Sequence, residues 1–280
     1  MRGWRRTSSS GPLSLRVGCG WRDVAPDSTV STAPRGFVHY RKQMAQAGAP
    51  LTFRVPSVNL KLAVQFGCMG AAAMSGRYDG IVTPSNALIC GNKSNWWGFT
   101  GRENVDGTLR SFAGPGLAEE CDSLPALAHD AEDKLRPAMA RATSGHGLNV
   151  RHVLHAFAPS SAYPRQPAEL ALRRTYANCL ELSARLGVGG LALPALGCGV
   201  AGFPSKVGAR AAFDAIDDAV SIGLWSASDG EVHGDVDGEG GTAKGASRAT
   251  TAPARLTFVL LDEGVYATFA DEAHARWGGK

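Results

Sequence analysis

Apolar and polar positions alternate along most of the chain in two different rhythms, which predict strands interleaved with helices. Short runs of apolar residues predict strands at 58–66, 80–83, 150–157, 190–196 and 255–261. Apolar residues at helical spacing predict helices at 167–186, 205–222 and 264–277, and a further short one at 37–47. The continuous apolar run at 190–196 is typical of a strand covered on both faces. The pattern therefore predicts α/β layers around a mostly parallel or mixed sheet.

The longest stretch without a charged residue, 186–205, is twenty residues long and has to be tested as a membrane span. It contains six glycines and two prolines, which favour a strand followed by a loop over a lipid-facing helix. The sequence thus predicts no membrane partner.

The composition is that of a globular protein: 280 residues, 44% hydrophobic and 19% charged, which excludes fibrous and fully disordered classes. The six cysteines form no C-x-x-C pair. This spacing argues against a disulfide scaffold or a thiolate zinc site and favours a reducing, intracellular compartment. Nothing in the sequence calls for a metal or a cofactor.

Two segments differ in composition from the rest. Residues 1–55 carry a net charge of +7 and the remainder −3, so no global attraction of nucleic acid is expected. Residues 1–22 hold five arginines, four serines and no acid, as in an organelle transit peptide or a disordered basic terminus; both interpretations stay open. Residues 226–253 are rich in glycine and acids and poor in large apolar residues. We therefore expect a tail at 1–50, and one domain at 51–280 with a flexible insertion at 226–253.

A glycine-rich loop, Gly197-Cys198-Gly199-Val200-Ala201-Gly202-Phe203, joins the predicted strand at 190–196 to the next helix. Its backbone N–H groups and the following helix N-terminus suit a phosphate or diphosphate. Two alternatives remain open: a turn needed only for packing, and a Rossmann-type NAD site, against which the missing acid after the helix counts. Cys198 has no histidine placed to activate it, which argues against a covalent mechanism.

Polar residues follow two further predicted elements. Asn86 comes just after the strand at 80–83, where an amide can bind a ribose hydroxyl, and Asp106 begins a helix, where a carboxylate can hold a water. Each residue type is also common as a cap or turn residue. His152 and His155 lie three apart on a predicted strand and so point to opposite faces, which argues for structural roles.

Six segments in order resemble the macro domain family: 60–67, 79–86, 104–115, 151–159, 193–204 and 256–262 with Tyr266. The resemblance covers about 57–275 apart from the insertion. It implies a three-layer α/β/α sandwich with a mixed central sheet. It also implies binding of ADP-ribose, free or on an ADP-ribosylated protein, and in several branches of the family hydrolysis of the ADP-ribosyl linkage.

The resemblance also assigns roles to individual residues. Asn86 matches the residue near the distal ribose, and Asp106 with Gly107 matches the Val-Asp-Gly motif whose Asp assists catalysis. Asn86 and Asp106 are thus the catalytic candidates. The ligand-binding candidates are Cys68, Met69, Asn86, Asp106, Gly107, Gly197, Cys198, Gly199, Val200, Ala201, Gly202 and Phe203.

Several positions depart from the family pattern. Cys68 stands where many relatives place the Asp that reads adenine, Arg110 where some hydrolases carry a His, and Ala201 where an aromatic often stacks on ribose. Gly101-Arg102-Glu103-Asn104 stands where relatives have an all-glycine stretch. Trp96-Trp97 lie in an insertion that is either an aromatic lid or a packed surface loop. Without the all-glycine stretch, the backbone is expected to approach the diphosphate less closely, which weakens the case for efficient hydrolysis more than the case for binding. A hydrolase and a non-catalytic ADP-ribose reader, each a monomer in the cytoplasm or an organelle, therefore remain the main hypotheses.

Overall fold

The computed structural model describes residues 49–56, 58, 60–91, 104–128, 132–162, 167–224, 253 and 255–278. The predicted helix at 37–47, the Trp96-Trp97 insertion and nearly all of 226–253 lie outside these residues. No helix in the described ranges is long and apolar enough to cross a membrane.

Seven strands form one mixed sheet in the order β1-β2-β7-β6-β3-β5-β4. The five central strands, β2, β7, β6, β3 and β5, are parallel to one another. The two edge strands, β1 and β4, run antiparallel to their neighbours. The strands are β1 Leu51–Val55, β2 Leu60–Phe66, β3 Gly80–Pro84, β4 Ala140–Ser144, β5 His152–Ala156, β6 Gly190–Leu193 and β7 Arg255–Leu260.

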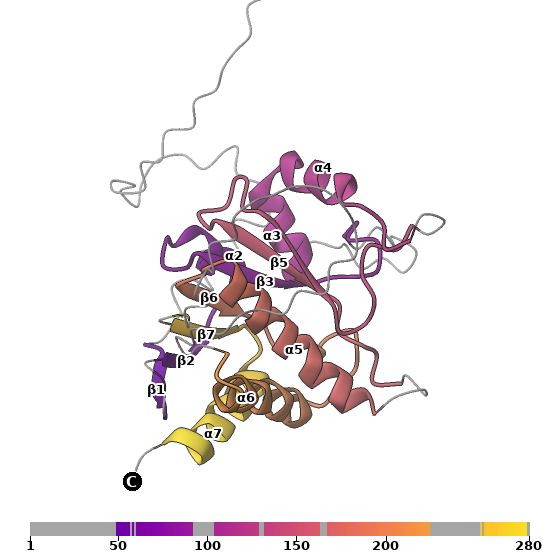
Figure 1. The fold of residues 1–280 in the computed structure, drawn as a ribbon. Coiled ribbons are helices and arrows are strands. Elements are labelled where there is room, and N and C mark those ends of the chain that lie inside the picture. The colour runs from indigo at the N-terminus through magenta and orange to yellow at the C-terminus, as the bar shows by residue number, and fades with distance from the viewer. Residues whose placement is uncertain are drawn as a thin grey trace, which may run out of the picture.

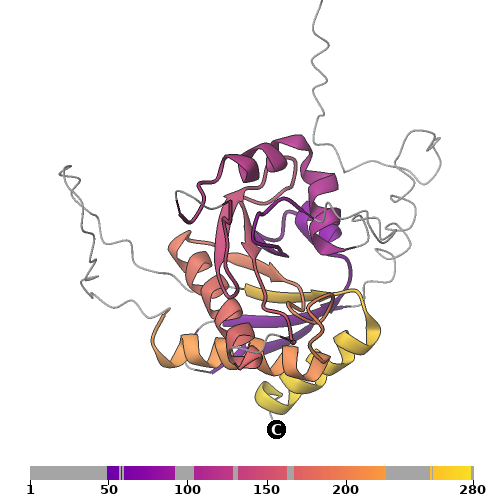
Figure 2. The ribbon, with the colours of Figure 1, turned by 90° about the vertical axis from the view of Figure 1, so that its right-hand side faces the viewer.

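Helices cover both faces of the sheet, which gives three layers (Figures 1 and 2). One core cluster lies between the sheet and α5, α6 and α7, and a second lies on the side of α2, α3 and α4. The described helices are α2 Met69–Met74, α3 Val105–Ala113, α4 Pro115–Ser123, α5 Ala168–Arg185, α6 Ser205–Ser221 and α7 Glu263–Trp277. The expected three-layer architecture is confirmed.

The alternation of side chains along β2 shows how the sequence makes these layers. Leu60, Leu62 and Val64 point into the core beneath α7, while Lys61 between them is exposed on the other face. Because the five parallel strands run in one direction, the loops that follow them meet at one edge of the sheet, here called the carboxyl edge. The residues that begin these strands meet at the opposite, amino edge.

The predicted elements that fall within the described residues are confirmed, with shifted ends. The strand expected at 190–196 ends at Leu193, because the proline that follows has no N–H to donate to the ladder. The helix expected at 167–186 spans Ala168–Arg185, and Gly187 just after it has φ +63°. β1 and β4 were not predicted, since both are five-residue edge strands in which polar and apolar positions mix.

Candidate functional site

Loops from three parallel strands bring the predicted site residues to the carboxyl edge. Cys68 follows β2 and is the N-cap of α2, Asn86 follows β3, and the glycine-rich loop follows β6. Residues from distant parts of the sequence thus end at one edge, as expected for ligand sites of parallel α/β sheets.

The glycine-rich loop depends on two glycines with left-handed backbone angles. Gly197 has φ +83° and Gly202 has φ +78°. A Cβ on Gly197 would lie 2.9 Å from side-chain carbons of both Leu172 and Phe203. Phe203 is 5% exposed and packs in the core, so its ring anchors the loop to the core.

The tip of this loop presents backbone N–H groups. Gly202 N donates to Gly199 O at 2.9 Å, and Ser161 N donates to Ala201 O at 2.8 Å, which fixes the turn. The amides of Gly199, Val200 and Ala201 have no hydrogen-bond acceptor within the described part of the chain. Val200 is 99% exposed, and α6 begins a few residues later. Consecutive free amides ahead of a helix N-terminus suit an anion.

Cys198 points away from the loop tip. Its sulfur lies against Gly208 of α6, where a Cβ would overlap it. Burial raises the pKa of the Cys198 thiol to about 11. A thiol that stays protonated at neutral pH is a poor nucleophile, which agrees with the sequence-based argument against a covalent mechanism.

Asp106, near the start of α3, is held from two sides. Its Oδ2 accepts a hydrogen bond from Arg110 Nε at 3.0 Å, and its Oδ1 accepts one from Thr83 Oγ1 at 3.3 Å. The residue is 7% exposed. Burial raises the pKa of the carboxyl group, and the attraction of Arg110 opposes this rise. Asp106 is therefore part of a buried ion pair, with little access to a substrate water.

Arg110 continues the network into the interior. Its Nη2 donates to Ile89 O at 2.7 Å and lies 3.7 Å from the sulfur of Cys121. The same sulfur lies 3.7 Å from His155 Nε2, which is also 2.9 Å from Thr143 Oγ1. Burial lowers the pKa of His155 to about 3, so the ring is neutral at physiological pH.

Asn86 uses its amide to hold its own loop. Its Nδ2 donates to Gly91 O at 2.9 Å, and its Oδ1 accepts from Cys90 N at 3.4 Å. The other two candidates after β2 are buried: Cys68 is 6% exposed, with its thiol pKa raised by burial, and Met69 is 4% exposed in the second core cluster.

Sequence reasoning found the segments but missed the partners of their polar residues. The spacing of four between Asp106 and Arg110 is a readable signal for an ion pair on one helix face. Thr83 and Ile89 give no such signal, because their contacts form only when β3 and α3 come together. No group of three metal-ligating side chains occurs within the described ranges.

Comparison with known proteins defines the class. A family model for the macro domain matches residues 95–212. The chain is 31% identical over 143 residues to the O-acetyl-ADP-ribose deacetylase of Enterobacter cloacae, an overlap of 51% of this chain and 77% of that protein. It is 32% identical over 139 residues to the uncharacterized protein Ta1105 of Thermoplasma acidophilum, covering 50% of this chain and 69% of that protein.

Solved structures share the fold. The Oceanobacillus iheyensis macrodomain with ADP superposes with a TM-score of 0.59 at 18% identity, covering 81% of this chain and 97% of that one. The Trypanosoma brucei macrodomain in complex with ADP-ribose gives 0.53 at 21% identity, covering 79% and 73%. The chain belongs to the macro domain family.

Proposed function

We propose that this protein binds ADP-ribose at the carboxyl edge of the sheet, with the diphosphate on the amides of Gly199, Val200 and Ala201. The observation that carries the proposal is the exposed run of three backbone N–H groups without an acceptor in the described structure. Family membership supports the ligand, since relatives include O-acetyl-ADP-ribose deacetylases and macrodomains solved with ADP or ADP-ribose. The remaining predicted site residues, such as Asn86 and Cys68, lie on neighbouring loops at the same edge.

The ion pair of Asp106 with Arg110 favours binding without turnover through this carboxylate. A general base must reach the water that it activates, whereas both oxygens of Asp106 already accept hydrogen bonds from the protein. Hydrolysis is the second candidate, favoured by the deacetylase relatives. A non-catalytic reader releases no acetate from O-acetyl-ADP-ribose and no ADP-ribose from a modified protein. A hydrolase releases one of these products, and if it uses Asp106 the Asp106→Asn variant no longer does.

Calorimetric titration with ADP-ribose, beside ADP and NAD, tests the binding proposal. Val200→Pro removes one of the three N–H groups, whereas Val200→Ala removes the exposed side chain and keeps the N–H. We expect Val200→Pro to lose affinity by about tenfold or more, because a hydrogen bond to a charged group contributes roughly 1.5–3 kcal/mol. Val200→Ala should bind as the natural protein does. Equal affinities for a folded Val200→Pro protein, or no binding by the natural protein, would disprove the proposal.

We further infer that residues 51–280 form the working domain, preceded by the tail at 1–50, and that it acts as a monomer in a reducing compartment. The described part of the chain begins just before β1, and its five cysteines are free thiols. Light scattering after gel filtration tests the monomer; a stable dimer would contradict it.

A further inference from the structure

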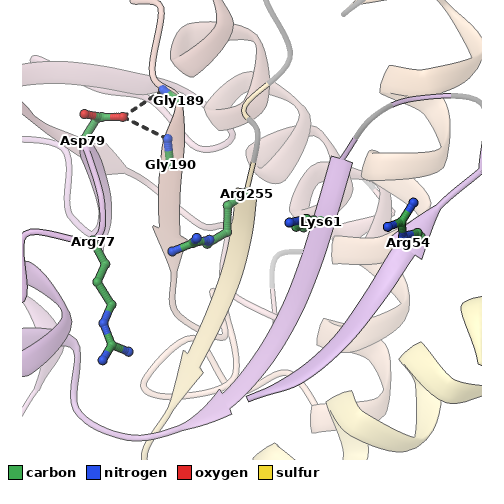
Figure 3. A pocket seen from close by; sticks show the side chains of 7 residues that line it. All are labelled: Arg54, Lys61, Arg77, Asp79, Gly189, Gly190 and Arg255. Carbon is green, nitrogen blue, oxygen red and sulfur yellow. Dashed lines mark hydrogen bonds between the residues drawn. The ribbon is translucent and has the colours of Figure 1, made fainter. Parts of the chain in front are cut away.

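A hollow lies at the amino edge of the sheet, opposite the glycine-rich loop (Figure 3). Its volume is about 490 Å³. It is formed where strands β2, β6 and β7 begin and antiparallel β1 ends. Its lining residues are Arg54, Lys61, Arg77, Asp79, Gly189, Gly190 and Arg255.

Three of these cations stand in one row across the sheet. Arg54 pairs with Lys61, and Lys61 pairs with Arg255. Residues directly opposite one another on neighbouring strands point to the same face, about 4.8 Å apart per strand. Gly190 is the next residue in the row and has no side chain, which leaves that end open. The topology therefore places three positive side chains within about 10 Å, and Arg77 adds a fourth.

The charges in this hollow are largely uncompensated. Within the part of the chain that the structure describes, none of its four cations has a carboxylate within 4.0 Å, whereas Arg173 and Arg276 elsewhere each pair with acids. Asp79 is the one acid among the lining residues. Its Oδ2 accepts hydrogen bonds from Gly189 N and Gly190 N, both at 3.0 Å, which Figure 3 shows as dashed lines. Its Oδ1 lies 3.5 Å from Arg151 Nε. A concave surface with this charge focuses positive potential.

A neighbouring hollow extends the first along the face of the sheet that carries Lys61. It measures about 480 Å³ and shares all four cations with the first. Behind the cationic row lies a row of small residues, Thr52 opposite Ala63 and Ala63 opposite Thr257, whose size leaves this space open. α7 packs on the other face of these strands, against Phe53.

Thr257 supplies an independent sign that the hollow accepts a ligand. It is 1% exposed and lines the hollow, yet its Oγ1 has no hydrogen-bond partner in the described structure. A buried hydroxyl without a partner is rare and costs stability. An acceptor oxygen from a bound molecule would satisfy it, and Gln65, which lines the same hollow, offers an amide donor.

We propose that the amino-edge hollow binds a small anion with two or more adjacent phosphate groups, such as a triphosphate. Guanidinium groups match phosphate oxygens in pairs, and the ammonium group of Lys61 adds a point charge. The chain's own N-terminal segment is an unsuitable occupant, because it is strongly basic itself. This site shares no residue with the glycine-rich loop and is independent of the ADP-ribose proposal.

Titration calorimetry of the full chain with inorganic triphosphate tests the site. The Lys61→Ala/Arg255→Ala variant should weaken triphosphate binding by at least about tenfold and leave ADP-ribose affinity unchanged, because the two sites lie at opposite edges. Arg174→Ala is the matched control: it removes an exposed cation on α5, across the sheet, and should have no effect. Unchanged triphosphate affinity in the double variant, or equal losses in the control, would overturn the proposal.

Two further arms sharpen the result. ATP is titrated beside triphosphate in the natural protein and in the Lys61→Ala/Arg255→Ala variant, because ATP also fits the glycine-rich loop. A loss of ATP affinity equal to that of triphosphate assigns recognition to the phosphates alone, and a larger loss assigns a nucleotide; either loss supports the site. ATP and triphosphate affinities that the double variant keeps in full count against it. Thr257→Val keeps the shape and removes the hydroxyl, so it should raise stability and lower triphosphate affinity together. A Thr257→Val protein that is folded and binds triphosphate as well as the natural chain counts against the proposal.

Discussion

Replacing Arg110 by leucine leaves the buried Asp106 carboxylate without its cation. The two side chains are 16% and 9% exposed and lie 3.0 Å apart. Breaking a buried pair by removing one partner costs about 3–5 kcal/mol, because an uncompensated charge remains. The hydrogen bond from Arg110 to Ile89 O is lost as well, whereas the apolar leucine recovers part of the burial. We therefore expect Arg110→Leu to lower the free energy of unfolding by about 3 kcal/mol.

Urea unfolding followed by circular dichroism measures this loss. Arg185→Leu is the matched control, because Arg185 and Glu181 have the same i,i+4 spacing but lie 3.8 Å apart and are 62% and 49% exposed. An exposed pair of this kind contributes about 0.5 kcal/mol or less. Equal, small losses in the two variants would refute the view that Asp106 is held as a buried ion pair.

The pH dependence gives a second check on the same variant. Burial raises the pKa of Asp106 above its usual 3.8, so the folded state keeps this proton more readily than the unfolded chain. The contribution of the group to stability is fully present below pH 3.8 and is lost as the pH rises through the folded-state pKa. Leucine removes the attraction and hydrogen bond that lower this pKa. The deficit of Arg110→Leu should therefore be larger at neutral than at acidic pH, and a pH-independent deficit would contradict the assignment.

Three other predictions concern buried or strained positions. His155 has a folded-state pKa of about 3 against 6.5 in the unfolded chain, so its contribution to stability is present above pH 6.5 and falls toward pH 3; urea midpoints across this range should depend less on pH in His155→Gln. Gly197→Ala should lower the free energy of unfolding, measured by urea titration, by about 1–3 kcal/mol. Gly199→Ala should leave it nearly unchanged, because a Cβ at Gly199 meets open space. Gly208→Ala should melt at a lower temperature because its Cβ meets Cys198, and Cys198→Ala should restore the melting temperature; a double variant as unstable as the single one would refute this contact.

The sequence predicts the site by position better than by contact. Asn86, Asp106 and the loop at 197–203 each follow or begin a predicted element, so their gathering at one edge follows from parallel strands. The hydrogen bond from Asn86 Nδ2 to Gly91 O could not be predicted, because it depends on the shape of a loop with no periodic pattern. The Asp106–Arg110 pair could be anticipated from its spacing, but its burial could not, since burial depends on helices and strands packed around it.

The cationic row was beyond sequence reasoning for a different reason. Lys61 and Arg255 are neighbours only because β7 pairs with β2, and Arg54 joins them only because β1, which was not predicted, completes that edge. Strand order is a property of the whole sheet and leaves no local trace in the sequence. The same holds for Thr257, whose unpartnered hydroxyl depends on the small residues beside it.

The place of β7 has a consequence for how the protein is made. This last described strand, Arg255–Leu260, lies between β2 and β6 and is the described strand that hydrogen-bonds both to the β1–β2 hairpin and to the part of the sheet that holds β3, β4, β5 and β6. During synthesis the β1–β2 hairpin and the remaining strands can form separately, but they cannot join into one sheet until β7 has left the ribosome. A nascent chain that stops before Arg255 exposes two open strand edges at once, which makes it a target for chaperones and prone to aggregation.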